Sequence, residues 1–168
     1  MNFKNIKSTF YINLLFIIII FCIDRASKIY VLEQFKKEFN NILFESKFLN
    51  IHLIWNEGIA FGLMSFDQKI FYNSLTMIIL IVILLILYFA YKNQGLKRYA
   101  LLSISAGALG NLFDRLFYNA VPDFIDFHIN EFHWFIFNLA DVFISLGVII
   151  MIMTEFFGND KEKFNEKY

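Results

Sequence analysis

Four long apolar runs divide the chain, and more polar stretches separate them. The runs cover residues 10–32, 70–91, 96–116 and 136–157. A helix rises 1.5 Å per residue, so a run of about 20 residues can cross a hydrocarbon core about 30 Å thick. The pattern therefore predicts a mainly α-helical integral membrane protein, in which residues 1–168 form one domain built as a bundle of four transmembrane helices.

The first run is free of charge only from Phe10 to Ile23, and it reaches spanning length by continuing through Asp24 and Lys28. Its basic start and apolar core resemble a secretory signal peptide. The core is followed by Cys-Ile-Asp-Arg rather than by a small-x-small cleavage site, and a lipobox would need a small residue in place of Phe21. We therefore expect this segment to be retained as a span.

The segment between the first two runs, residues 33–69, is too polar to cross a membrane. Its alternation of residue types over 48–54 predicts a short strand. Residues 61–66 read as an interfacial piece lying on the membrane. We expect a small β-like and amphipathic segment here, outside the bilayer.

The basic residues predict how the helices are oriented. They flank the first run at Lys4 and Lys7, lie between the second and third runs at Lys92, Lys97 and Arg98, and follow the fourth at Lys161, Lys163 and Lys167. The loop at residues 117–135 contains no Lys or Arg. Because short cytoplasmic loops carry the excess of Lys and Arg, both termini are predicted to be cytoplasmic. Residues 33–69 and 117–135 are then expected on the outer side.

Composition excludes several other classes of protein. Hydrophobic residues make up 58% of the chain, which is high for a soluble domain. The formal net charge is zero, so the basic surface typical of a nucleic-acid-binding protein is missing. The single cysteine, Cys22, excludes an internal disulfide and a cysteine-based metal cluster.

Ionisable residues within the runs are candidates for function, because each costs about 2.5–3.5 kcal/mol at the centre of a membrane helix. Asp24 and Lys28 lie four apart on one helix face, which suits an ion pair with a purely structural role or a functional one. Asn111 and Asp114 share a face near the outer end of the third run, where Arg115 can neutralise Asp114 or reach lipid headgroups.

The fourth run opens with a second Asn-x-x-Asp pair, Asn138 and Asp141. If the helix begins near Ile136, Asp141 lies roughly 7 Å along it, in the first turns, where the helix dipole favours negative charge. Asp123 and Asp126 are expected in the outer loop, where a solvated carboxylate needs no special explanation.

Glycines mark two further features of the sequence. Gly58 and Gly62, after Trp55-Asn-Glu, suit a turn at the membrane interface. Gly107 and Gly110 belong to a face of small residues on the third run that favours close packing between membrane helices.

Several acids therefore gather near the outer surface. Two carboxylates held close together share a proton, so that one can activate water while the other protonates the leaving amine. The sequence lacks His-Glu-x-x-His and Gly-x-Ser-x-Gly motifs. His128 and His133 share one loop and could bind a metal, but loop histidines usually do not, so we expect no metal and no cofactor.

Five stretches resemble, in the same order, the lipoprotein signal peptidases (signal peptidase II, aspartic peptidase family A8). They are Asp24–Lys28, Asn56–Phe61, Gly107–Arg115, Val121–Asp126 and Phe137–Asp141. The resemblance implies a membrane aspartic endopeptidase that removes the signal peptide from diacylglyceryl-modified prolipoproteins, cutting just before the lipidated cysteine.

The resemblance also implies roles for individual residues. Spacing alone would equally make Asp114 and Asp141 the catalytic pair, whereas in the family the pair matches Asp123 and Asp141. Pro122 stands where the family more often has Val, and it stiffens the backbone before Asp123. Supporting or substrate-binding roles are implied for Asn111, Asp114, Arg115, Asn138, Ala140, Asn56, Gly58, Asp24 and Lys28, with Asn111, Asn138 and Arg115 orienting the pair.

By the same resemblance we expect a cofactor-free monomer in the bacterial inner membrane, with its site near the extracytoplasmic face and with lipid, but not nucleic acid, as a partner. Two alternatives stay open. One is a non-enzymatic membrane protein with a proton relay through Asp24, Lys28 and Asp141, which would place charges near the midplane. The other is an intramembrane peptidase whose substrates carry no lipid.

Overall fold

The computed structural model describes residues 3–37, 42–58, 68–130 and 132–165, which form four helices and one four-stranded sheet. The helices are α1 (Phe3–Lys37), α2 (Gln68–Lys92), α3 (Gly95–Tyr118) and α4 (Leu139–Asn165). The strands are β1 (Ile42–Glu45), β2 (Leu49–Asn56), β3 (Val121–Ile129) and β4 (Phe132–Phe137). The sheet is antiparallel in the order β1-β2-β3-β4.

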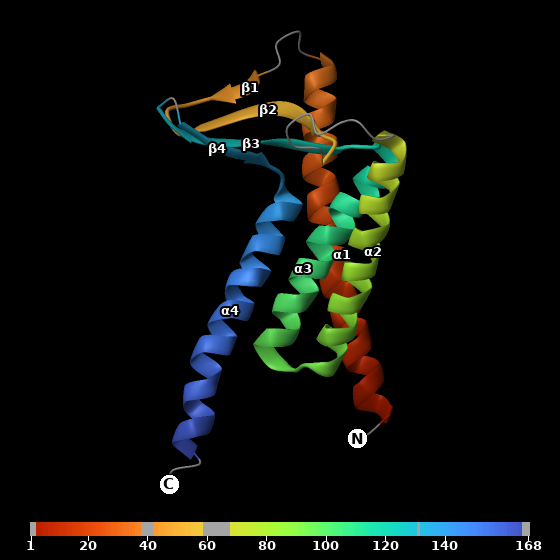
Figure 1. Ribbon diagram of the computed structural model, residues 1–168, viewed down its shortest axis with the longest axis vertical. Helices are drawn as coiled ribbons and strands as arrows, with labels where there is room; N and C mark the ends of the chain where they lie inside the picture. Colours follow the sequence, from red (N-terminus) through yellow and green to blue (C-terminus); the bar gives the residue numbers. More distant parts are fainter. Residues whose placement is uncertain (1–2, 38–41, 59–67, 131, 166–168) are drawn as a thin grey trace.

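The sheet lies across one end of the helices, and α1 begins and α4 ends at the opposite end (Figure 1). Strands β1 and β2 come from the segment between α1 and α2, and β3 and β4 come from the segment between α3 and α4. The short connection between α2 and α3 lies at the end away from the sheet (Figure 1). The two segments predicted to share one side therefore meet in a single sheet.

Close packing of the helices depends on glycines, as the small-residue face predicted. A Cβ at Gly107 would lie 2.5 Å from the carbonyl oxygen of Ala140 on α4, and one at Gly110 would lie 2.5 Å from a carboxylate oxygen of Asp24 on α1. Both distances are far shorter than a van der Waals contact. Helix α3 can approach α1 and α4 this closely only because it lacks side chains at these positions.

Two helical segments, Tyr72–Lys92 and Leu139–Phe156, are long and apolar enough to cross a membrane. Only 17% and 11% of these segments is buried, whereas the core helix of a soluble protein would be mostly buried. Large apolar side chains such as Met77, Ile81 and Ile152 lie exposed on them. Exposed apolar surface of this extent marks an interaction site, and it suits contact with lipid.

The structure corrects the prediction for residues 117–135. We expected an outer loop, but these residues end α3 and form the hairpin of β3 and β4. Asp123 is 3% exposed and Asp126 is fully buried, so neither is a solvated loop carboxylate. The fourth helix begins at Leu139 instead of near Ile136, because β4 continues to Phe137.

The prediction of a short strand over residues 48–54 is confirmed by β2, which covers Leu49–Asn56. Both the interfacial piece expected at residues 61–66 and Gly62 lie outside the described residues.

Candidate active site

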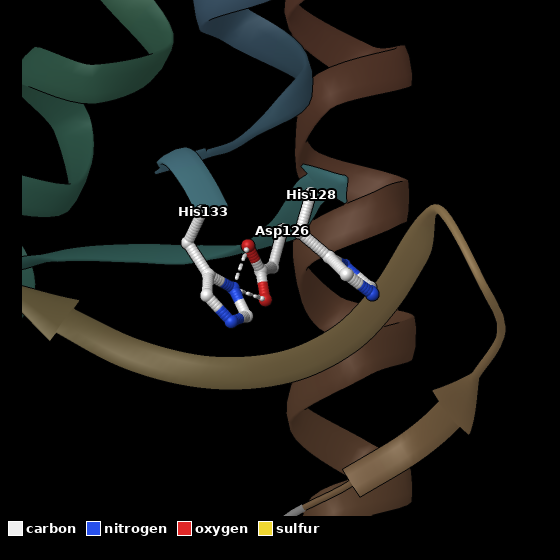
Figure 2. A group of neighbouring side chains, drawn as sticks. All are labelled: Asp126, His128 and His133. Atoms are coloured by element: carbon white, nitrogen blue, oxygen red, sulfur yellow. Dashed lines mark hydrogen bonds and ion pairs between the residues drawn. The ribbon is translucent and has the colours of Figure 1, made fainter. Parts of the chain in front are cut away.

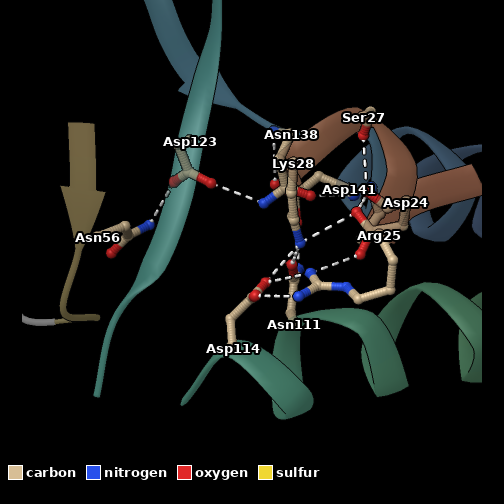
Figure 3. A network of polar contacts seen from close by, with 11 residues as sticks. Asp24, Arg25, Ser27, Lys28, Asn56, Asn111, Asp114, Asp123, Asn138 and Asp141 are labelled. Carbon is tan, nitrogen blue, oxygen red and sulfur yellow. Dashed lines mark hydrogen bonds and ion pairs between the residues drawn. The ribbon is translucent and has the colours of Figure 1, made fainter. Parts of the chain in front are cut away.

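Asp123 and Asp141 are joined by one residue, Asn138, which follows β4 and precedes α4 (Figure 3). The Nδ2 of Asn138 donates a hydrogen bond to Oδ1 of Asp123 at 2.6 Å. The backbone N–H of Asn138 donates to Oδ2 of Asp141 at 3.1 Å. A carboxylate on a strand and a carboxylate on a helix are therefore held by the same buried residue.

The local sequence explains why Asn138 and Asp141 lie in this way. The backbone N–H of Asp141 donates in return to Oδ1 of Asn138 at 3.3 Å. The two reciprocal hydrogen bonds form a capping box, in which the N-cap and N3 residues satisfy each other's backbone donors. The cap that starts α4 thus also sets the position of Asp141, and it leaves the amide nitrogen of Asn138 free to donate to Asp123.

Asp123 lies in a buried setting on β3. Besides the bond from Asn138, its Oδ2 accepts a hydrogen bond from Nδ2 of Asn56 at 2.9 Å. Burial raises the pKa of the Asp123 carboxyl, and the negative charge of Asp141 adds to this. The hydrogen bonds from Asn138 and Asn56 oppose the rise in pKa without cancelling it.

Asp141 is held from the helix side by a chain of two contacts. The Nδ2 of Asn111 on α3 donates to Oδ1 of Asp141 at 2.8 Å. The Nζ of Lys28 on α1 donates to Oδ1 of Asn111 at 2.9 Å. Because Lys28 can only donate, it fixes which end of the Asn111 amide group faces Asp141.

Four buried or half-buried charges lie beneath these residues and balance one another. Lys28 forms ion pairs with Asp24 at 3.0 Å and with Asp114 at 2.7 Å. Arg25 binds both oxygens of Asp114 and also Oδ2 of Asp24. Both carboxylates are fully buried, and Lys28 is 1% exposed. Two acids and two bases give no net charge, which is the condition for keeping such groups out of water.

Asp24 also reaches α4 directly. Its Oδ1 accepts a hydrogen bond from the backbone N–H of Ala140 at 3.1 Å. This N–H belongs to the first turn of α4, where backbone donors have no partner within the helix. Ala140 is fully buried, and its Cβ lies near Gly110 and its carbonyl near Gly107. A larger side chain than that of Ala140 would not fit between α3 and α4.

On the other side of Asp123, a turn after β2 fixes Asn56. The backbone N–H of Gly58 donates to Oδ1 of Asn56 at 2.8 Å. The amide nitrogen of Asn56 is therefore the atom that faces Asp123. Gly58 has φ +74°, and a Cβ there would lie 2.9 Å from a guanidinium nitrogen of Arg115.

The orienting role expected for Arg115 stays a prediction. Within the described residues it makes no hydrogen bond to Asp123, Asp141 or Asp114, and its Nη1 is buried without a partner. Its guanidinium packs 5.7 Å from the ring centre of Tyr72. Asp114 pairs instead with Lys28 and with Arg25, and Arg25 is a residue that the sequence analysis did not single out.

A cavity of about 210 Å³ opens beside Asp141. Its lining is mostly apolar and comes from the end of β4 and the first two turns of α4. The lining residues are Phe135, Phe137, Asp141, Val142, Ser145 and Leu146. An apolar chain held there would lie next to the carboxyl group of Asp141.

Comparison with known proteins identifies relatives of this arrangement. A peptidase family described as Signal peptidase (SPase) II matches residues 16–157. The lipoprotein signal peptidase of Pelagibacter ubique is 47% identical over 99% of both chains. That of Anaplasma phagocytophilum is 40% identical over 82% of this chain and 86% of its own.

Solved structures of bacterial membrane enzymes share the fold. One, determined at 2.3 Å by the in meso method, has a TM-score of 0.71 and 29% identity, and the match covers 89% of this chain and 90% of that one. A second, at 1.9 Å, has a TM-score of 0.70 and 30% identity.

Proposed function

Because the chain belongs to the signal peptidase II family and is therefore a peptidase, we propose that it removes signal peptides from diacylglyceryl-modified prolipoproteins. Asp123 and Asp141 form the catalytic dyad in this proposal. The observation that carries it is the placement of Asn138, whose side chain binds one carboxylate while its backbone binds the other.

The different surroundings of the two carboxylates suggest different roles. Asp123 is buried and has a raised pKa, so it carries the proton that the pair shares. Asp141 is partly exposed, and donors from Asn111 and Asn138 point at its two oxygens. These donors stabilise its charge, which makes Asp141 the base that activates water.

The reaction then follows the general acid–base scheme. Water attacks the scissile carbonyl carbon and gives a proton to Asp141, while Asp123 donates its proton to the carbonyl oxygen. The tetrahedral intermediate collapses when the C–N bond breaks. Its hydroxyl proton returns to Asp123, and the proton on Asp141 passes to the leaving amine. Both carboxyl groups regain their starting states, and the step needs no metal or other cofactor.

The remaining contacts keep this geometry in place. The network of Asp24, Arg25, Lys28 and Asp114 joins α1 and α3, and through Ala140 it reaches the start of α4. Since every member of the network has an oppositely charged partner, the cluster suits a fixed scaffold better than a proton relay. Its members support the dyad without touching the reacting atoms.

We further propose that all four helices span the bacterial inner membrane, with both ends of the chain cytoplasmic and the sheet at the extracytoplasmic face. Trp55 and Tyr118 support this placement of the sheet. Their rings lie 5.6 Å apart and both are more than 40% exposed, beside the sheet end of α3. Exposed Trp and Tyr residues gather at the boundary between membrane and water. The protein acts as a monomer in this proposal.

The cavity beside Asp141 gives the substrate a place to bind. Its apolar lining suits the apolar side chain of a signal peptide or an acyl chain of the lipidated cysteine. In either case the scissile bond would lie against the dyad at the membrane surface, which is where the bond before a lipid-anchored cysteine must lie.

The test is cleavage of a synthetic prolipoprotein by the purified protein in detergent, with diacylglyceryl-modified and unmodified forms compared. The proposal requires cleavage of the modified form at the bond before the cysteine, identified by the masses of both products. Equal cleavage of the unmodified form would favour an intramembrane peptidase without lipid dependence, and no cleavage of either form would overturn the proposal.

A further inference from the structure

The three histidines of the chain lie on neighbouring strands, close to one buried carboxylate, that of Asp126. Figure 2 shows two of them, His128 and His133, beside Asp126. His52 lies on β2, His128 and Asp126 on β3, and His133 on β4. His128 and His133 are direct partners across β3 and β4. Their rings stack with centroids 5.0 Å apart. This cluster lies outside the hydrogen-bond network of the proposed dyad.

The contacts within the cluster are short. The Nδ1 of His133 lies 2.8 Å from Oδ2 and 3.0 Å from Oδ1 of Asp126. Asp126, His128 and His133 each present one potential metal ligand atom, and these atoms all lie within 4.8 Å of one another. The Nδ1 of His52 lies 3.8 Å from the same carboxylate, at the edge of the group.

One buried atom of the cluster has no hydrogen-bond partner. His128 is 9% exposed, and its Nδ1 is buried with no hydrogen-bond partner in the described part of the chain. A buried polar atom without a partner costs about 1–3 kcal/mol. A bound ion would supply the missing contact.

The orientation of β3 is also unusual for a strand that faces a core. Asp126 and His128 are buried, whereas the apolar residues that alternate with them, Phe127 and Ile129, are 44% and 51% exposed. A strand normally turns its apolar side inward. Here the inward side of the strand is polar, and it carries Asp126 and His128, two of the residues that can bind a metal.

We propose that Asp126, His128 and His133 form a Zn²⁺ site. Imidazole nitrogen together with a carboxylate oxygen is a donor set that zinc prefers, and three protein ligands leave a fourth position for water. Zinc bonds of about 2.0–2.2 Å put the ligand atoms of a tetrahedral site about 3.3 Å apart. The three ligand atoms lie within 4.8 Å of one another, so the side chains would have to draw closer around a bound ion.

The site would be distinct from the proposed dyad. It joins β3 to β4 directly, and these two strands carry Asp123 and lead into Asn138. A metal that links the strands would hold the hairpin together from outside the active site. Cleavage by the dyad would not require the metal, so removing zinc is expected to lower thermal stability while activity at low temperature is retained.

The proposal is tested by zinc binding to protein purified in detergent without a histidine tag. The protein is stripped with chelator and dialysed against micromolar Zn²⁺, and bound metal is counted by mass spectrometry. Wild type is expected to bind one zinc per chain and to unfold at a higher temperature with zinc than without it. Mg²⁺ serves as the control ion, because it prefers oxygen ligands.

Variants identify the ligands. His133→Ala and His128→Ala are expected to lose the bound zinc and the zinc-dependent rise in unfolding temperature. The side chain of His133 is 53% exposed, so its loss is expected to leave the protein folded, which is checked by elution as a single species. Cys22→Ser and His52→Ala are matched controls expected to keep one zinc.

The outcomes are decisive in either direction. X-ray absorption at the zinc edge should show nitrogen and oxygen neighbours with the outer-shell signal of imidazole. The proposal is overturned if wild type binds no zinc, or if His133→Ala binds as much as wild type. The assignment of the three ligands is overturned if His52→Ala loses zinc as completely as His133→Ala does.

Discussion

Replacing Asn138 by serine separates the two tasks of this residue. Serine caps a helix about as well as asparagine, so it can keep the contact with the backbone N–H of Asp141. It lacks the amide nitrogen that donates to Asp123 at 2.6 Å. Asn138→Ser should therefore alter the dyad and leave the start of α4 intact. Asn138→Ala should lose both the hydrogen bond to Asp123 and the cap of α4.

The sign and size of the effect follow from this hydrogen bond. The bond stabilises the ionised form of Asp123 and opposes the rise in its pKa that burial causes. Removing the bond therefore raises the pKa further. A hydrogen bond to a charged group contributes about 1.5–3 kcal/mol, and about 1.4 kcal/mol corresponds to one pKa unit. Because Asn56 still donates to Asp123, we expect a shift near the lower limit, of about one unit.

The assay is the pH dependence of kcat/KM for the lipidated substrate. Activity falls at high pH when the dyad loses its shared proton, so the alkaline limb should move upward by about one pH unit in Asn138→Ser. The midpoint belongs to the pair rather than to one residue. Since a midpoint is independent of the height of the profile, a general loss of activity would not mimic the shift.

Thermal unfolding supplies the control. Asn138→Ala loses the helix cap, worth about 1 kcal/mol, and its Tm should fall by about 2–4 °C, while Asn138→Ser should unfold close to wild type. An alkaline limb that stays in place or moves downward in Asn138→Ser would refute the assignment of the shared proton to Asp123.

Other predictions concern packing, charge and metal. Gly110→Ala would place a methyl group 2.5 Å from the carboxylate of Asp24, and we expect a loss of about 1–3 kcal/mol of stability, read as a lower Tm. Lys28→Met should cost about 3–5 kcal/mol, because it leaves buried carboxylates short of positive charge, and adding Asp114→Asn should recover part of the loss; additive effects would contradict the coupling. Glu155→Gln, which removes an exposed ion pair, should change Tm little. Chelator should leave initial rates of cleavage unchanged at low temperature, and an immediate loss of turnover would contradict a metal-free dyad.

The helices could be read from the sequence because their signal is local. Each helix includes most of one apolar run, and the pair of Asp24 and Lys28 formed where a spacing of four residues predicts it. The small-residue face around Gly107 and Gly110 could also be predicted from the sequence, since close packing requires residues without side chains. These features depend on neighbours within a few turns.

The hairpin of β3 and β4 was missed because its pattern is misleading. Buried Asp126 and His128 alternate with exposed Phe127 and Ile129, which is the reverse of the expected arrangement. The apolar end of β4 merges with the apolar start of α4, so periodicity alone placed the helix boundary too early, near Ile136.

Contacts across the chain could not be read from spacing. Arg25 pairs with Asp114, 89 residues away, and only the packing of α1 against α3 brings them together. The same pairing accounts for Asp114, which spacing alone offered as a member of the dyad and which the structure places among cations instead. The pairing of Asp123 with Asp141 as the catalytic residues stays a prediction, supported by Asn138.

The most direct test of the dyad is the turnover of Asp123→Asn and Asp141→Asn with lipidated substrate. Glu155→Gln serves as the matched carboxylate control, and each variant is first shown to elute and unfold as a folded protein. The account predicts that both dyad variants lose nearly all turnover while Glu155→Gln cleaves like wild type. A folded Asp123→Asn or Asp141→Asn variant that still cleaves at a rate near that of wild type would contradict it.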